Sequence, residues 1–192
     1  MGAEVDLILA SASPRRRELL ALTGLSFAVD APEVDEHTAL GAKAAVQELS
    51  RRKALASAAR HPGEVILAAD TLVAIDDQPL GKPADEADAC RMLRALSDRW
   101  HQVCTGVTCV DRQGGLHSGV DVSDVYFDPM TDEEILAYVR TGEPMDKAGA
   151  YALQGGASLF IRELRGSPSG VIGLPMHLTR KLLLECGLEI MT

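Results

Sequence analysis

The amino-acid sequence predicts a mixed α/β or α+β fold in a single domain over residues 1–192. Segments with helical spacing alternate along the chain with short apolar runs that are typical of strands. Two long strand-like segments, 101–111 and 116–126, flank Gln113-Gly114-Gly115 and predict an antiparallel hairpin. A sheet that contains such a hairpin is not purely parallel. The chain has no internal repeat and no obvious linker, so one domain is expected.

The first part of the chain predicts two strands and two helices. Ser13 has the character of an N-cap, and Pro14 suits the first position of the helix that follows. Gly24 is a plausible end for that helix. A second helix, rich in Ala, Lys and Arg, ends at His61-Pro62-Gly63. In order, the expected elements are a strand at 7–10, a helix at 14–22, a strand at 27–30 and a helix at 42–60.

The apolar run 65–69 predicts a strand covered on both faces. It reaches Asp70-Thr71, and extended character resumes at 72–75 before a turn at 76–79. Thr131 and Glu134 have the spacing of a capping box that opens a helix. The remaining expected elements are a helix at 85–96, the hairpin, a helix from 131 to 140, a glycine-rich loop at 149–156, a strand at 159–164 and a helix at 175–186.

Composition and charge exclude several classes of protein. Hydrophobic residues make up 46% of the chain and charged residues 24%, as in ordinary globular domains. The formal net charge of −9 should repel nucleic acid. No apolar stretch approaches the roughly 20 residues of a membrane span. The four cysteines lack zinc-like pairing or a disulfide pattern, so we expect a cytoplasmic protein that binds neither nucleic acid nor membrane.

Arg15, Arg16 and Arg17 fall in the first turn of the predicted helix at 14–22. Cations there oppose the helix dipole at a cost of about 0.3–1 kcal/mol each. A bound anion would reverse that sign, because free backbone N–H groups and guanidinium groups would share one negative ligand. The alternative is a solvated arginine cluster that acidic neighbours neutralise.

Asp70 stands at the end of a buried run, where an unpaired carboxylate is costly. It can cap a turn, pair with a cation, or hold a metal ion or an activated water; on the residues alone the turn cap is favoured. Glu33, after Pro32, is a second isolated carboxylate, whereas Asp35 and Glu36 suit a solvated acidic segment. Two carboxylates among cations would suit Mg²⁺ bridging phosphate oxygens.

Two lysines and one amide complete the candidate set. Lys82 lies between Gly81 and Pro83, which favour extended backbone and close approach. Lys53 is weaker evidence, because a solvated helix face explains it equally well. Gln154, in a loop of small residues, offers the donor and acceptor that match the edge of uracil or thymine.

A series of short motifs spans nearly the whole chain. They are Ser11-Ala12-Ser13-Pro14-Arg15-Arg16, Pro32-Glu33, Lys53-Ala54, Ala69-Asp70-Thr71, Gly81-Lys82-Pro83, His101-Gln102-Val103 with Thr105-Gly106, Asp146-Lys147-Ala148-Gly149-Ala150-Tyr151, Gln154-Gly155 and Gly173-Leu174-Pro175. In this order they resemble the Maf family of nucleoside triphosphate pyrophosphatases.

The resemblance implies a metal-dependent enzyme, with Mg, Mn or Co as the divalent cation, that hydrolyses the α–β phosphoanhydride of a nucleoside triphosphate. The products are the monophosphate and pyrophosphate. It also implies two lobes around a strongly twisted mixed sheet, similar to the inosine triphosphate pyrophosphatases, with a cleft between them and usually a homodimer.

Carried over by motif, Asp70 is the catalytic carboxylate that accepts the proton of the attacking water. Lys53 and Lys82 join it in catalysis, and Ser11, Arg15 and Arg16 also surround the triphosphate. Glu33 and Asp70 would serve the metal. The loops of the chain are similar to the branch that acts on dTTP and UTP, with Arg15, Thr71 and Gln154 assigned to substrate choice.

Two other functions stay open at this stage. A sister branch prefers 7-methyl-GTP, and a nucleotide-binding regulator of septum formation is possible for the family, although Asp70, Lys53 and Lys82 are intact. The chain lacks the phosphate-binding loop of kinases. Two positions depart from the family pattern. Arg52 stands where glutamate is frequent, which would remove an acidic group beside Lys53, and Asp98 stands where glycine is usual.

Overall fold

A computed structural model describes residues 5–191 of the chain. In these residues seven strands form one sheet in the order β2-β1-β3-β5-β6-β7, with β4 paired to β3. The elements are β1 (Leu7–Leu9), α1 (Pro14–Ala21), β2 (Phe27–Val29), α2 (Ala42–Arg60), β3 (Ile66–Ile75), β4 (Gln78–Leu80), α3 (Glu86–Leu96), β5 (Arg99–Val110), β6 (Leu116–Phe127), α4 (Asp132–Val139), the 3-10 turns η1 (Glu143–Asp146), η2 (Ala148–Ala150) and η3 (Gly156–Leu159), β7 (Ile161–Arg165), α5 (Pro168–Ile172) and α6 (Met176–Glu185).

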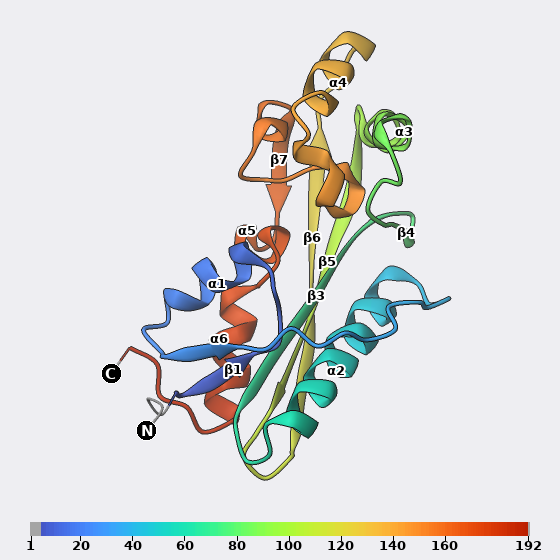
Figure 1. The fold of residues 1–192 in the computed structure, drawn as a ribbon. Helices are drawn as coiled ribbons and strands as arrows, with labels where there is room; N and C mark the ends of the chain where they lie inside the picture. Colours follow the sequence, from blue (N-terminus) through green and yellow to red (C-terminus); the bar gives the residue numbers. More distant parts are fainter. Residues whose placement is uncertain (1–4, 192) are drawn as a thin grey trace.

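The sheet is mixed, which confirms the predicted fold class. Strand β1 pairs in parallel with β2 and β3, whereas β3, β5, β6 and β7 form antiparallel pairs. The long strands β3, β5 and β6 run through two lobes (Figure 1). One lobe contains α1, β1 and α6, and the other contains α3, α4 and β7.

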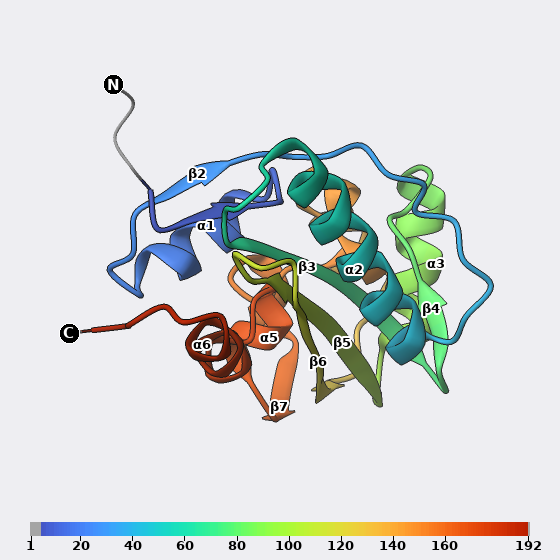
Figure 2. The ribbon, with the colours of Figure 1, turned by 90° about the horizontal axis from the view of Figure 1, so that it is seen from below.

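Helices cover both faces of the long strands. Figure 2 shows α2 on one face of β3 and β5 and α6 on the opposite face. Gly106 in β5 explains how closely α2 approaches, because a Cβ atom there would lie 2.2 Å from the Val46 carbonyl oxygen. Gly106 therefore has a packing role beneath α2, whereas the hydroxyl of Thr105 donates to the Gly170 carbonyl of α5.

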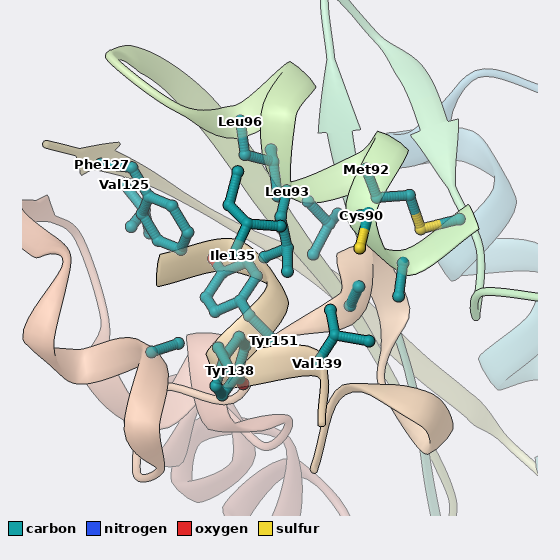
Figure 3. Close-up of a cluster of buried hydrophobic side chains, with 14 of the residues drawn as sticks. Cys90, Met92, Leu93, Leu96, Val125, Phe127, Ile135, Tyr138, Val139 and Tyr151 are labelled. Atoms are coloured by element: carbon teal, nitrogen blue, oxygen red, sulfur yellow. The ribbon is translucent and has the colours of Figure 1, made fainter. Parts of the chain in front are cut away.

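The second lobe has its own buried core, formed by α3, α4 and the ends of β5 and β6 (Figure 3). The rings of Phe127 and Tyr151 meet edge to face with centroids 4.8 Å apart, a favourable aromatic geometry. Tyr151 follows η2, so this core anchors the loop that contains residues 146–154.

The structure corrects several expectations about single elements. The turn-cap interpretation of Asp70 is wrong, because β3 continues unbroken through it and Asp70 pairs with Gly106 of β5. The expected turn at 76–79 is confined to Asp76-Asp77, because strand β4 begins at Gln78, and the short helix α5 and the 3-10 turns were not predicted. The last strand begins at Ile161 rather than 159. Within residues 5–191, no helix combines the length and apolar character needed to cross a bilayer.

Candidate active site

A cavity of about 660 Å³ lies against β3 and is also lined by the start of α1, the 146–154 loop and α5. That volume is in the range of small-molecule sites. Eight of the nine candidate site residues line it; the exception is Glu33. The eight are Ser11, Arg15, Arg16, Lys53, Asp70, Thr71, Lys82 and Gln154.

The start of α1 has the expected geometry. The Ser13 hydroxyl accepts a hydrogen bond from the Arg16 amide at 3.5 Å, Pro14 is the first helical residue, and the first turn has no acid. Arg15 and Arg16 are half-buried in the cavity wall, whereas Arg17 is exposed and does not line it. The predicted arginine cluster is therefore divided between the cavity and the surface.

Arg16 is held by three acceptors from separate segments. Its Nε donates to the Gly173 carbonyl at 2.8 Å, its Nη1 to Ser11 Oγ at 3.1 Å and its Nη2 to Thr71 Oγ1 at 3.2 Å. Thr71 Oγ1 also lies 2.9 Å from Thr105 Oγ1. Burial lowers the pKa of Arg16, but a guanidinium stays protonated in proteins. Arg16 thus fixes α1 against β3 and α5 and keeps its charge at the cavity wall.

Lys53 contacts two of the carboxylates that line the cavity, Asp70 and Glu36. Its ammonium Nζ lies 2.5 Å from Asp70 Oδ1 and 2.7 Å from Glu36 Oε1. Asp70 is only 8% exposed, so this cation compensates for most of its burial. The hydrogen bond from Lys53 lowers the pKa of Glu36 and keeps that carboxyl ionised at neutral pH.

The acid that lines the cavity is Glu36, which the sequence analysis assigned to a solvated segment, and not Glu33, the expected metal ligand. Glu33 is exposed and does not line the cavity, whereas Glu36 does. Arg52 accounts for the position of the acidic segment, because its Nη1 donates to the carbonyls of Asp35 at 3.0 Å and His37 at 3.2 Å. The residue that departs from the family pattern therefore holds the loop that brings a carboxylate to Lys53.

Two loops close the other side of the cavity. The Gly149 amide donates to the Gly81 carbonyl at 3.0 Å, which places Lys82 beside the 146–154 loop. Gly149 has φ of +67°, and a Cβ atom there would meet the Val73 side chain at 2.7 Å, so this loop requires glycine. Asp146 and Lys147 form an ion pair at the rim, and Gln154 is exposed there.

A buried contact between Tyr151 and His101 holds the 146–154 loop against β5. Tyr151 Oη lies 2.7 Å from His101 Nε2. Burial lowers the pKa of His101 to about 3, so this imidazole is neutral at physiological pH. Within the His101-Gln102-Val103 motif, His101 thus contacts the cavity loop through Tyr151, whereas Val103 lines the cavity itself.

The lining charges favour an anion. Five cationic side chains line the cavity against three carboxylates, although the whole chain has a net charge of −9. The cations are Arg15, Arg16, Lys53, Lys82 and Lys147, and the carboxylates are Glu36, Asp70 and Asp146. Such a concave group of cations beside a buried carboxylate suits a polyphosphate and an attacking water.

The carboxylates that line the cavity are also candidate ligands for a divalent cation. Among residues 5–191, no three His, Cys, Asp or Glu side chains gather into a metal cage. Asp70 and Glu36 nevertheless direct carboxylate oxygens at one point, the ammonium of Lys53. Mg²⁺ commonly takes one or two protein carboxylates and completes its shell with waters and substrate phosphates, so these residues fit such an ion.

Comparison with known proteins supports the relationship suggested by the motifs. A family model described as Maf-like protein matches residues 6–186. The chain is 48% identical over 191 residues to a dTTP/UTP pyrophosphatase of Symbiobacterium thermophilum, covering 97% of each chain. It is 50% identical over 173 residues to a dTTP/UTP pyrophosphatase of Geobacter sulfurreducens, covering 88% of this chain and 91% of the relative.

A third relative, the dTTP/UTP pyrophosphatase of Vibrio cholerae, is 48% identical over 180 residues, which cover 92% of this chain and 96% of the relative. Among solved structures, a nucleoside-triphosphatase (dITP/XTP pyrophosphatase) of Mycobacterium abscessus matches 65% of this chain and 75% of its own, at 16% identity. Its TM-score of 0.42 is too low to support a conclusion.

Proposed function

This chain belongs to the Maf family, and from that premise we propose that it hydrolyses dTTP and UTP to the monophosphate and pyrophosphate. It is a nucleotide pyrophosphatase, as its named relatives are. The observation that carries the proposal is the convergence of Arg15, Lys53 and Lys82 on the cavity that contains Asp70. A cavity lined by these cations attracts the negatively charged triphosphate.

In the proposed reaction, a water molecule attacks the α-phosphorus and the bond from that phosphorus to the α–β bridging oxygen breaks. Asp70 accepts the proton of the water, and pyrophosphate leaves with the bonding electrons. Lys53 orients the Asp70 carboxylate through the contact at 2.5 Å. Arg15 and Lys82 offset the negative charge that develops on the phosphoryl oxygens.

We assign the divalent cation to Asp70 and Glu36, the two carboxylates that meet at Lys53. Glu33 was the expected second ligand; it does not line the cavity, whereas Glu36 lines it and contacts Lys53, which favours Glu36 instead. Bound there, Mg²⁺, Mn²⁺ or Co²⁺ would supply a positive charge to the phosphate oxygens. Lys53 remains within reach of both carboxylates, so the pair is not left uncompensated without the ion.

Selection of the base is assigned to Arg15, Thr71 and Gln154. Gln154 at the cavity rim can donate to and accept from the edge of uracil or thymine. Thr71 is held by Arg16 and Thr105, so its hydroxyl cannot turn freely. A pocket built on hydrogen bonds discriminates strongly against a base that leaves them unmade, which favours pyrimidines over 7-methyl-GTP.

We also infer that both lobes act as one domain, because β3, β5 and β6 pass through both (Figure 1). The homodimer implied by the family stays a prediction, which light scattering coupled to size-exclusion chromatography would test.

The test is pyrophosphate release across dTTP, UTP, CTP, dATP, GTP and 7-methyl-GTP with Mg²⁺, Mn²⁺ or Co²⁺. We expect dTTP and UTP to be the preferred substrates, with the monophosphate and pyrophosphate as products. Preference for 7-methyl-GTP would assign the chain to the sister branch, and binding without turnover would support a regulator.

A further inference from the structure

Two cysteines that do not line the cavity meet between β5 and α6. Cys109 lies in β5 and Cys186 caps the C-terminal end of α6, the helix that Figure 2 shows on the face opposite α2. Their Sγ atoms are 2.7 Å apart within the buried cluster between β5 and α6. Cys109 is fully buried and Cys186 is 8% exposed.

The distance between the two sulfurs distinguishes the chemistries open to a pair of thiols. Two thiolates bound to one tetrahedral zinc ion lie about 3.8 Å apart, given Zn–S bonds of about 2.3 Å. A disulfide bond is about 2.05 Å long. At 2.7 Å the pair is too close to share a zinc ion, and closing the remaining gap to a disulfide needs only a small movement of the side chains.

A charged group lies next to the thiols. His117 is the register partner of Cys109 across the β5–β6 hairpin, so both side chains are on the same face of the sheet. Its Nε2 lies 2.9 Å from Asp111 Oδ2 and its Nδ1 3.5 Å from Glu185 Oε2. With a carboxylate at each nitrogen, the imidazolium form is favoured, and the hydrogen bond with Asp111 raises the pKa of His117.

The contacts around the two thiols shift their pKa values in opposite directions. The hydrogen bond with Cys109 lowers the pKa of Cys186 and raises that of Cys109, and the charge of His117 also lowers the pKa of Cys186. The C-terminal end of α6 opposes a thiolate through its dipole, so these two contacts have to outweigh it. Cys186, the more exposed sulfur, is then the nucleophile and Cys109 the resolving thiol.

We propose that Cys109 and Cys186 are a peroxide-sensitive dithiol that closes to a disulfide and ties α6 to β5. The Cys186 thiolate attacks one oxygen of hydrogen peroxide; an S–O bond forms, the O–O bond breaks and hydroxide leaves, giving the sulfenic acid. Cys109 sulfur then attacks Cys186 sulfur; the S–S bond forms, the S–O bond breaks, and hydroxide takes the Cys109 proton to leave as water. In sum, two thiols and one peroxide give one disulfide and two waters.

The chain contains its own control for simple exposure. Cys90 is 6% exposed, close to the 8% of Cys186, yet within residues 5–191 it has no thiol or histidine hydrogen-bond partner. Cys104 is fully buried on the same strand as Cys109. If exposure alone governed oxidation, Cys90 and Cys186 would react alike; the proposal requires that only Cys186 and Cys109 be consumed.

The experiment treats the reduced full-length protein with hydrogen peroxide, then alkylates it under denaturing conditions and measures its mass. We expect alkylated thiols to fall from four to two, with the loss of two hydrogen atoms and full reversal by dithiothreitol. Tryptic peptides 100–112 and 182–192 should be cross-linked, and Cys104→Ala, which leaves Cys109 as the one cysteine of the first peptide, should retain the link. The oxidised protein should melt roughly 10 °C higher, because the bond closes a long loop.

Cys109→Ala and Cys186→Ala should each abolish the link, whereas Cys90→Ala should not. If a variant fails to fold, the peptide map of the wild-type chain decides alone. The proposal would be overturned if four free thiols remained at peroxide doses that oxidise glutathione, or if the link formed through Cys104 or Cys90. It would also be overturned by a stable oxygen adduct on Cys186 without a link, or by stoichiometric zinc in the wild type that Cys186→Ala loses.

Discussion

Replacing Arg52 with alanine tests whether Arg52 holds the loop at 35–37 in the position that brings Glu36 to Lys53. The variant loses two hydrogen bonds to the carbonyls of Asp35 and His37 and one to Glu48. The Arg52 side chain is 35% exposed, so we take the two loop contacts together at about 1–2 kcal/mol. That free energy corresponds to a fall of about 5- to 30-fold in the population of the loop conformation that brings Glu36 to Lys53.

The measurement is kcat/KM for dTTP by pyrophosphate release, and the expected loss for Arg52→Ala is in that range of about 5- to 30-fold. Arg52→Lys retains the charge but loses the planar guanidinium, whose Nη1 donates to both loop carbonyls while its Nε is held by Glu48, so it should lose most of the same activity. Arg51→Ala is the matched control, because it removes the same charge from the preceding position of α2 and should leave activity nearly unchanged.

A double-mutant cycle separates positioning from simple electrostatics. If Arg52 acts by placing Glu36, the variant Arg52→Ala/Glu36→Gln should have an activity within about threefold of Glu36→Gln alone. Losses that multiply in full, or a fully active Arg52→Ala, would refute the reasoning.

Four further outcomes are expected. Asp70→Asn should lose about 10²–10³-fold in kcat with little change in melting temperature, measured on the same preparation. Chelation of divalent metal by EDTA should abolish turnover, and addition of Mg²⁺, Mn²⁺ or Co²⁺ should restore it, whereas activity that persists in EDTA would refute the metal assignment. Burial lowers the pKa of His101 to about 3, whereas the unfolded value is 6.5, so between these pH values the unfolded chain binds one more proton than the folded chain. The free energy of unfolding should therefore fall by about 1.4 kcal/mol per pH unit as the pH drops below about 6.5. Urea unfolding of His101→Gln should lack this pH dependence. Asp98→Gly should raise the melting temperature, because Asp98 has φ of +54°, a backbone conformation that favours glycine. A fall would show instead that the hydrogen bond from Tyr126 Oη to Asp98 outweighs the relief of that strain.

Local signals in the sequence were sufficient for much of the fold. Ser13 and Pro14 began α1 as expected, Thr131 and Glu134 formed the capping box of α4, and the range 42–60 matched α2. These features depend on contacts within one turn of a helix, so the residues themselves encode them.

Features set by distant contacts were not predictable in the same way. Asp70 resembled a turn residue, yet the backbone of β3 continues because β5 pairs with it. Glu36 looked like a solvated acid, and only the folded position of Lys53 and Arg52 shows why it enters the cavity rather than Glu33. The three acceptors of Arg16 come from segments up to 157 residues away, which no local pattern reveals.

The most direct test of the central claim, that water attacks the α-phosphorus of a nucleotide held in this cavity, is hydrolysis of dTTP in water enriched in oxygen-18. We expect the heavy oxygen to appear in dTMP and the co-product pyrophosphate to be unlabelled. Label in pyrophosphate, or release of dTDP and orthophosphate, would contradict it.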